Sequence, residues 1–222
     1  MKLEPIRKNL TLKEQAYQAI RQAIFSNTLK PGTPLTEELL SNMLSISRTP
    51  IRSALQQLVY EKLACSDSTG HIYVSTITEK DVEDVTTLRA VLEPMAFDHA
   101  VLPLPDEYLS RLHDSYRKQT ELFHNEPENN LRYAEIDSEF HCLLSEISDN
   151  GLLTETIATL NTVMIRINIL SGTLHSHMQN ALNEHADIIS YLEKGQIPFA
   201  RLALEEHIKH VELRMFSQDN SV

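Results

Sequence analysis

The segment SISRTPIRSALQQL, residues 45–58, constrains the fold more than any other part of the chain. Pro50 is tolerated only in the first turn of a helix, where its missing N–H would have no intrahelical partner, and Ser47 suits the N-cap before it. Apolar side chains then recur at helical spacing and predict one buried stripe, formed by Ile51, Leu55 and Leu58. The opposite face is predicted to be cationic and hydrogen-bonding, with Arg48, Thr49, Arg52 and Gln56.

The residues on either side of this helix predict a helix-turn-helix unit followed by a hairpin. One helix is predicted to end near Asn27, and a second begins after Thr36, with an apolar face of Leu39, Leu40, Met43 and Leu44. Only residues 45–47 separate the second helix from the third, which is the spacing of a helix-turn-helix. Residues 64–75 place a turn signal between two β-prone runs. We therefore expect a winged helix over residues 1–75.

A winged helix of this kind suggests DNA binding. The first residues of a recognition helix face base edges, while hydroxyls and backbone amides bind phosphates. Guanidinium groups suit both guanine and phosphate, so the sequence does not divide these roles between the two arginines. Arginines on a helix face can also be merely solvated, but their place before a hairpin favours DNA. The candidate DNA contacts, including the wing tip, are Ser47, Arg48, Thr49, Arg52, Gly70 and His71.

The charges of the chain are divided unevenly. The 222 residues have a formal net charge of −11, yet residues 1–75 carry 9 Lys and Arg against 6 Asp and Glu, a net of +3. Residues 76–222 carry 11 against 25, a net of −14, together with nine of the ten histidines. This difference predicts two domains, 1–75 and 76–222. Two cysteines, no long apolar run and no signal-peptide pattern favour a cytoplasmic protein without a membrane partner.

The second domain is predicted to contain only helices, which makes the whole chain mainly α. Its first helix begins at Thr78 with a core stripe that includes Val85, Leu88 and Leu92, and we expect Pro94 to kink it. Further helices are predicted at about 106–124, 128–148, 151–172, 176–194 and 198–216. Helices of this length are predicted to pack as an antiparallel bundle of six or seven members.

Four polar residues occupy positions that should face the core of this bundle. Asp137 and His141 are four residues apart and share a helix face, while His185 and His207 have apolar neighbours at helical spacing. An aspartate and three histidines converging from three helices form a site for a divalent transition metal: zinc, nickel, manganese or iron. A histidine on an apolar face is more often a satisfied core residue, and this alternative stays open at this point.

Both halves of the chain resemble a known family. The run Ser-Arg-Thr-Pro-Ile-Arg-Ser-Ala-Leu at 47–55, with residues 31–35 and 70–74, resembles the DNA-binding half of GntR regulators of bacterial transcription. Glu37, Glu38 and Thr69 depart from the family pattern, because many members carry basic residues in these places. The Asp137-x3-His141 pair, followed by His185 and His207, resembles the metal-binding branch of the FCD subgroup.

The resemblance implies a homodimeric repressor that binds a palindromic operator and responds to a small carboxylate. It implies one divalent transition metal per chain, zinc first, held by Asp137, His141, His185 and His207. Arg89 and Arg166 are candidate effector contacts, although structural ion pairs would explain them equally well. A regulator that senses the metal itself is an alternative. A metal-dependent hydrolase is disfavoured, because four protein ligands fill a tetrahedral site and no HExxH motif is present.

Overall fold

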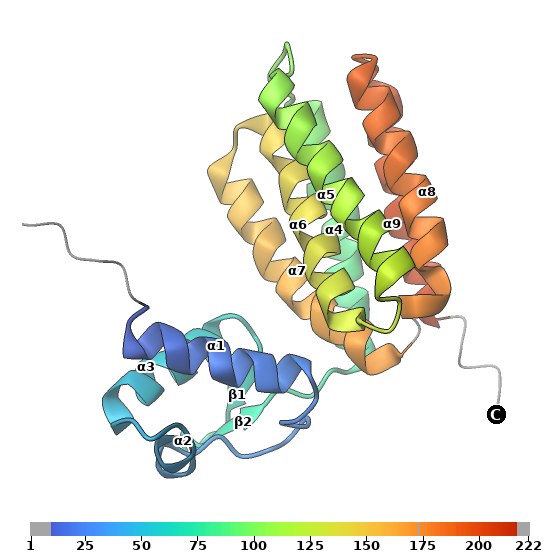
Figure 1. Ribbon diagram of the computed structural model, residues 1–222. Helices are drawn as coiled ribbons and strands as arrows, with labels where there is room; N and C mark the ends of the chain where they lie inside the picture. Colours follow the sequence, from blue (N-terminus) through green and yellow to red (C-terminus); the bar gives the residue numbers. More distant parts are fainter. Residues whose placement is uncertain (1–9, 173, 217–222) are drawn as a thin grey trace, which may run out of the picture. The chain divides into compact units, whose positions relative to one another are not determined.

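A computed structural model describes residues 10–172 and 174–216 of the chain. Backbone contacts divide the chain into two compact units, Met1–Thr76 and Ile77–Val222. Within the described residues, the first unit contains three helices and a two-stranded sheet, and the second contains six α-helices (Figure 1). The prediction of a mainly helical protein is therefore confirmed.

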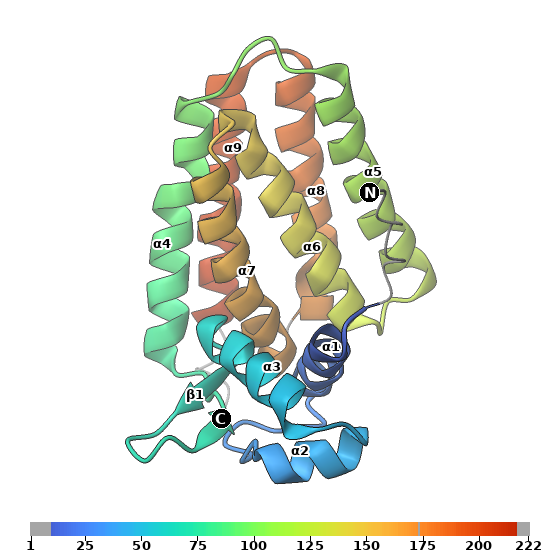
Figure 2. The same cartoon turned by 90° about the vertical axis from the view of Figure 1, so that its left-hand side faces the viewer.

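The first unit is the predicted winged helix. Its elements are α1 (Leu12–Phe25), α2 (Glu37–Leu44), α3 (Arg48–Tyr60), β1 (Ala64–Ser66) and β2 (Ile72–Val74). Thr36 caps α2, because its hydroxyl accepts a hydrogen bond from the Leu39 amide at 3.2 Å. The two strands are antiparallel, with Cys65 opposite Tyr73. Helix α3 packs against both α1 and α2 (Figure 2), and the polar side chains Arg48, Thr49 and Arg52 near its N-terminus stay exposed.

The predicted stripe of α3 is confirmed, because Ile51, Leu55 and Leu58 are at most 1% exposed. The apolar face predicted for α2 is wrong in part. Leu40 is buried, but Leu39 and Met43 lie on the surface. The reason is that α2 has only eight residues and packs mainly against α3, so one neighbouring helix covers one narrow side of it.

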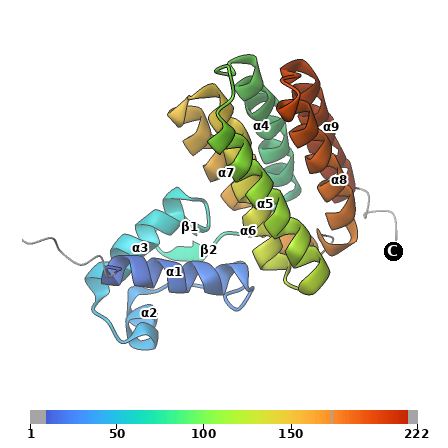
Figure 3. The ribbon, with the colours of Figure 1, turned by 45° about the horizontal axis from the view of Figure 1, so that its top comes forward.

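The second unit is an antiparallel bundle. Its helices are α4 (Glu79–Asp98), α5 (Asp106–Asn125), α6 (Asn130–Ser145), α7 (Gly151–Ser171), α8 (Leu174–Glu193) and α9 (Ile197–Phe216), and a short 3₁₀ turn, Glu146–Ser148, follows α6. Each helix makes most of its contacts with two neighbours, in the cyclic order α4, α9, α8, α5, α6, α7 (Figure 3), and smaller contacts, such as that of α4 with α6, cross the ring. Successive helices run in opposite directions (Figure 2). The bundle is therefore a closed ring with a single interior.

Both apolar and polar side chains fill that interior. The larger apolar cluster includes Phe97, Leu112, Phe140, Leu144, Ile157, Ile188 and Leu204. A smaller one consists of Val85, Val163, Met164 and Ile167. Buried polar and charged side chains also lie on these helices, among them Arg89, Glu93, Gln119, His141, His185 and His207. The interior of the bundle thus combines an apolar core with a polar site.

Helix α4 departs from its predicted stripe. Leu88 is exposed, whereas Arg89 and Glu93 are buried. Arg89 is predicted to look inward, whereas Glu93 would ordinarily be assigned to the solvent face; the two lie four residues apart and neutralise each other by an ion pair. The helix also continues through Pro94. Among the described residues, no helix is long and apolar enough to cross a bilayer.

Candidate metal centre and DNA-binding surface

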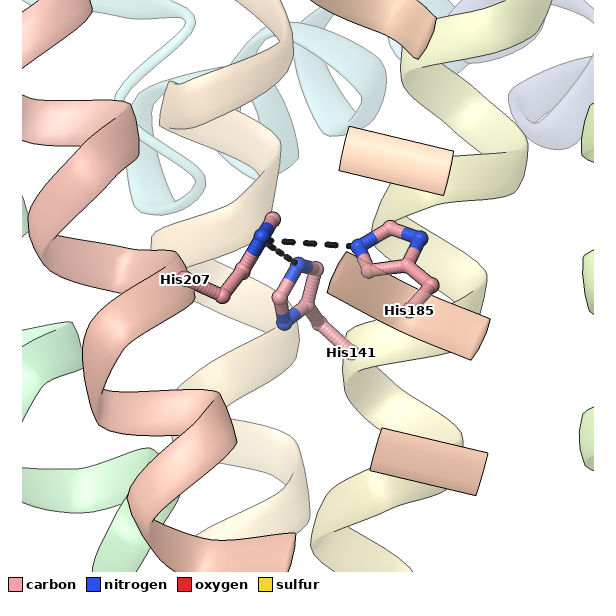
Figure 4. A group of neighbouring side chains, drawn as sticks. All are labelled: His141, His185 and His207. Atoms are coloured by element: carbon pink, nitrogen blue, oxygen red, sulfur yellow. Dashed lines mark hydrogen bonds between the residues drawn. The ribbon is translucent and has the colours of Figure 1, made fainter. Parts of the chain in front are cut away.

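Three histidines from three helices converge in the interior of the bundle. His141 lies on α6, His185 on α8 and His207 on α9, and each is at most 1% exposed. The Nε2 atom of His207 lies 3.2 Å from Nε2 of His141 and 3.4 Å from Nε2 of His185 (Figure 4). The same edge of each ring therefore faces one common point.

The other nitrogen of each ring has an acceptor. His141 Nδ1 lies 2.7 Å from Glu93 Oε2, and His185 Nδ1 lies 2.8 Å from Gln119 Oε1. His207 Nδ1 lies 2.7 Å from Glu184 Oε2. Each Nδ1–H donates to its acceptor, which fixes the tautomer and leaves a lone pair on Nε2. Lone pairs this close repel one another unless a cation or a proton lies between them.

The charge on Glu93 is maintained although the side chain is buried. Burial would raise the pKa of its carboxyl, but the Arg89 guanidinium and His141 more than offset this and lower the pKa to about 2. Arg89 Nε donates to Glu93 Oε1 at 2.5 Å. Burial lowers the pKa of His207, and the Glu184 hydrogen bond only partly opposes it. The uncharged imidazole, which is the form that binds metals, is therefore favoured.

Asp137 completes the group that the sequence predicts. Its Oδ1 lies 3.7 Å from His185 Nε2. Within the described contacts, the carboxylates of Asp137, Glu93 and Glu184 and the guanidinium of Arg89 give this cluster a formal charge of −2. Nitrogen ligands of a tetrahedral zinc ion, at about 2.0–2.1 Å from the metal, lie about 3.3 Å apart. Donor type, spacing and charge all fit one divalent cation.

A cavity of about 50 Å³ adjoins this cluster. Its lining includes Asp137, His141 and His207, together with Arg89. Arg89 Nη2 has no hydrogen-bond partner among the described residues, so part of the guanidinium is available for a ligand. Arg166 is buried on α7, where desolvation lowers its pKa, and it is not among the residues that line this cavity. Its role in effector binding stays a prediction.

Sequence reasoning missed the acceptors behind the histidines. The sequence patterns predict none of the three acceptors, Glu93, Gln119 and Glu184, as hydrogen-bond partners of the histidines. A signal for Glu93 does exist, since it lies three and four residues from Ala96 and Arg89 and thus shares their buried face. No local pattern marks Gln119, because its partner His185 is 66 residues away.

The predicted DNA contacts on α3 lie at the surface. Ser47 is the N-cap residue, and its hydroxyl makes no capping hydrogen bond. Arg48, Thr49 and Arg52 are exposed. Arg52 forms a two-pronged contact with Glu37 of α2, with 2.6 Å between Nε and Oε1 and 2.9 Å between Nη2 and Oε2. The guanidinium is thus held in one direction before any DNA binds.

The wing tip is shaped by one aspartate. Asp67 Oδ1 accepts hydrogen bonds from the amides of Thr69 at 2.8 Å and His71 at 3.0 Å, and Gly70 has a φ of +85°. The hydroxyl of Thr69 also donates to this oxygen, and these bonds lower the pKa of Asp67 to about 2. Between the wing and α3 lies a groove of about 290 Å³ whose lining includes Arg52, Gly70 and His71.

Known proteins with the same two parts identify the class. The family described as "Bacterial regulatory proteins, gntR family" matches residues 12–74 of this chain, and the FCD domain family matches residues 84–210. The transcriptional regulator YdhC of Bacillus subtilis is 26% identical over 196 residues, 88% of this chain and 87% of its own. The transcriptional repressor RspR of Escherichia coli is 26% identical over 210 residues, 94% and 91% of the two chains.

Solved structures support the fold. A transcriptional regulator GntR from Rhodococcus sp. RHA1 superposes with a TM-score of 0.80 at 20% identity, over 93% of this chain and 98% of its own. Escherichia coli McbR/YncC gives a TM-score of 0.77 at 20% identity, over 96% and 100% of the two chains.

A winged helix joined to a helical domain of this kind defines a bacterial transcription regulator. The chain belongs to the gntR family, in the group whose C-terminal half is an FCD domain. Its family and relatives are regulators rather than enzymes, which leaves the hydrolase alternative without support.

Proposed function

We propose that the chain is a homodimeric repressor that binds a palindromic operator through α3 and the wing and is released by a small carboxylate bound at a metal centre. Asp137, His141, His185 and His207 are the proposed metal ligands. The observation that supports the proposal is the convergence of three histidine Nε2 atoms. The Nδ1 atom of each ring already has a hydrogen-bond acceptor, so each Nε2 can bind a metal. Bound there, the metal would supply a Lewis-acidic position for a ligand carboxylate.

Arg89 supports the carboxylate part of the proposal. Its guanidinium lines the cavity and retains an unsatisfied Nη2, and guanidinium groups bind carboxylates by paired hydrogen bonds. Ligand binding would favour one arrangement of the DNA-binding units over another, so operator affinity would change by the difference in binding free energy between the arrangements.

The first test is the metal content of the purified protein, measured by elemental mass spectrometry. About one transition metal per chain is expected for the wild type. The Asp137→Ala/His141→Ala double variant should lose it, whereas His113→Ala should keep it, because His113 is exposed and pairs with Glu193. Equal metal content in the double variant and the wild type would contradict the ligand assignment.

The second test separates the effector from the metal. Arg89→Lys keeps a positive charge opposite Glu93 but removes the planar fork. We expect this variant to retain its metal and to lose the response of operator binding to the active compound from a screen of small carboxylates. If operator affinity instead follows metal occupancy and no carboxylate changes it, the protein senses the metal itself.

The third test concerns the DNA surface. Arg52→Ala should weaken binding to the operator in a gel-shift assay while the circular dichroism spectrum and the melting temperature stay unchanged, because the side chain is exposed. Unchanged affinity of a folded variant would remove α3 from the role of recognition helix.

A further inference from the structure

The contact between Arg52 and Glu37 occupies only one edge of the guanidinium. Glu37 accepts from Nε and from one N–H of Nη2, and Nη1 has no hydrogen-bond partner among the described residues. A guanidinium has five N–H donors in a planar fork, so the end formed by Nη1 and Nη2 keeps three of them. Paired hydrogen bonds to O6 and N7 of guanine require two donors from such a fork. The carboxylate therefore does not compete with a base for the end of the side chain.

The Glu37 side chain is the less exposed member of the pair, so it can fix the orientation of the Arg52 side chain. The Glu37 side chain is 28% exposed and lies in the first turn of α2, whereas the Arg52 side chain is 64% exposed. Both residues line the groove between the helices and the wing. A long arginine side chain loses conformational entropy when it binds, and this cost is smaller when a neighbour already orients it.

We propose that Glu37 is a positioning residue for base readout, which aligns Arg52 so that its free end reads one guanine in each operator half-site. This inference rests on the proposed function, in which α3 is the recognition helix. A carboxylate near the DNA weakens attraction to the phosphates, which is independent of sequence. Glu37 thus lowers general DNA affinity and raises discrimination between sequences.

Glu38 provides a matched control on the same helix. Its Oε2 lies 3.7 Å from Arg48 Nη2, which is beyond hydrogen-bond distance, and both side chains are more than half exposed. Removing either glutamate changes the net charge of α2 by the same amount. Only the removal of Glu37 releases a two-pronged contact with an arginine.

The experiment is selection of binding sites from a random library of DNA duplexes by the full-length wild type, Arg52→Ala, Glu37→Ala and Glu38→Ala, followed by sequencing. We expect the wild type to select a palindromic motif. Arg52→Ala and Glu37→Ala should lose the preference for the same guanine, while Glu38→Ala keeps it. On the duplex selected by the wild type, replacing that guanine by adenine should weaken binding about tenfold for the wild type and far less for Glu37→Ala.

Each other outcome has a distinct meaning. If the wild type selects no motif, the proposed function fails. If Arg52→Ala keeps the full motif, Arg52 reads no base, and the inference about Glu37 is overturned together with the recognition-helix assignment. If Arg52→Ala loses the guanine and Glu37→Ala keeps it, the inference about Glu37 is overturned. An equal gain in affinity of Glu37→Ala for all duplexes, with discrimination unchanged, overturns it as well. Glu37→Gln, which keeps one acceptor oxygen, serves as the second variant.

Discussion

Two arginine–glutamate pairs, one in each unit, have almost the same geometry in opposite surroundings. Arg52 Nε lies 2.6 Å from Glu37 and Arg89 Nε lies 2.5 Å from Glu93. The first pair has side chains that are 64% and 28% exposed, and the second has side chains that are 4% and 1% exposed. The contact distance therefore does not distinguish the roles of the two pairs, whereas their exposure to solvent does.

Because solvent surrounds the first pair, removing one of its partners costs little stability, whereas the second pair is hard to break. An exposed pair contributes roughly 0–1 kcal/mol to stability, so the contact with Glu37 orients Arg52 without adding much to the stability of the fold. A buried pair contributes little compared with apolar residues, yet removing one partner leaves an uncompensated buried charge. Glu93 also accepts a hydrogen bond from His141, so the buried pair serves to orient a candidate metal ligand.

The largest expected effect is therefore on stability. Glu93→Ala should lower the free energy of unfolding by about 3–5 kcal/mol, because Arg89 stays buried without its partner. Glu37→Ala, the matched change in the exposed pair, should change it by less than about 0.5 kcal/mol. Urea denaturation followed by circular dichroism measures both. Equal effects of the two substitutions would show that burial does not distinguish the pairs.

The next largest expected effect is an increase in the free energy of unfolding on metal binding, and we expect it from the second unit only. With free Zn²⁺ at 100 times the dissociation constant, the free energy of unfolding should rise by about 2.7 kcal/mol, because the metal binds the folded state. Thermal denaturation with and without a chelator measures this change. His185→Ala should abolish it, while His113→Ala should retain it, since that residue lies on the surface. A melting temperature of the wild type that does not respond to metal would contradict the proposed centre.

A structural feature is predictable from the sequence when the contacts that determine it join residues close together in the chain. The helices were predictable, because caps such as Thr36 and apolar spacing such as that of Ile51 and Leu55 act within a few residues. The inward position of Arg89 was predictable from its apolar neighbours at helical spacing, but that of Glu93 was not, since charged residues are normally exposed and pairing across one helical turn allows their burial.

The same reasoning applies to the candidate site. The four predicted ligands lie together, because each histidine has apolar neighbours on its own helix. Their hydrogen-bond partners come from other helices, as with Gln119 of α5 and His185 of α8. Pairings across a bundle depend on which helices become neighbours, and one helix alone does not contain that information.

The smallest expected effect concerns a third acid, and it sharpens the comparison of exposed and buried charge. Asp67 and Glu93 both have a pKa of about 2, but the first is lowered chiefly by the Thr69 hydroxyl at the surface, and the second by buried charges that outweigh desolvation. Since the pKa of Asp67 is lower in the folded state than its ordinary value of 3.8, its bonds to the wing are complete above pH 4 and are lost as the pH falls through about 2.

An NMR titration of the Thr69 and His71 amides measures this effect directly, because both donate to Asp67 Oδ1. Their shifts should titrate together with a midpoint near pH 2, and Asp67→Asn should remove the titration. Global stability should hardly change, since the wing tip is exposed. A midpoint near the ordinary aspartate value of 3.8 would mean that these hydrogen bonds do not persist in solution. The wing would then lack a fixed shape before DNA binds, and its contribution to recognition would require ordering on the DNA.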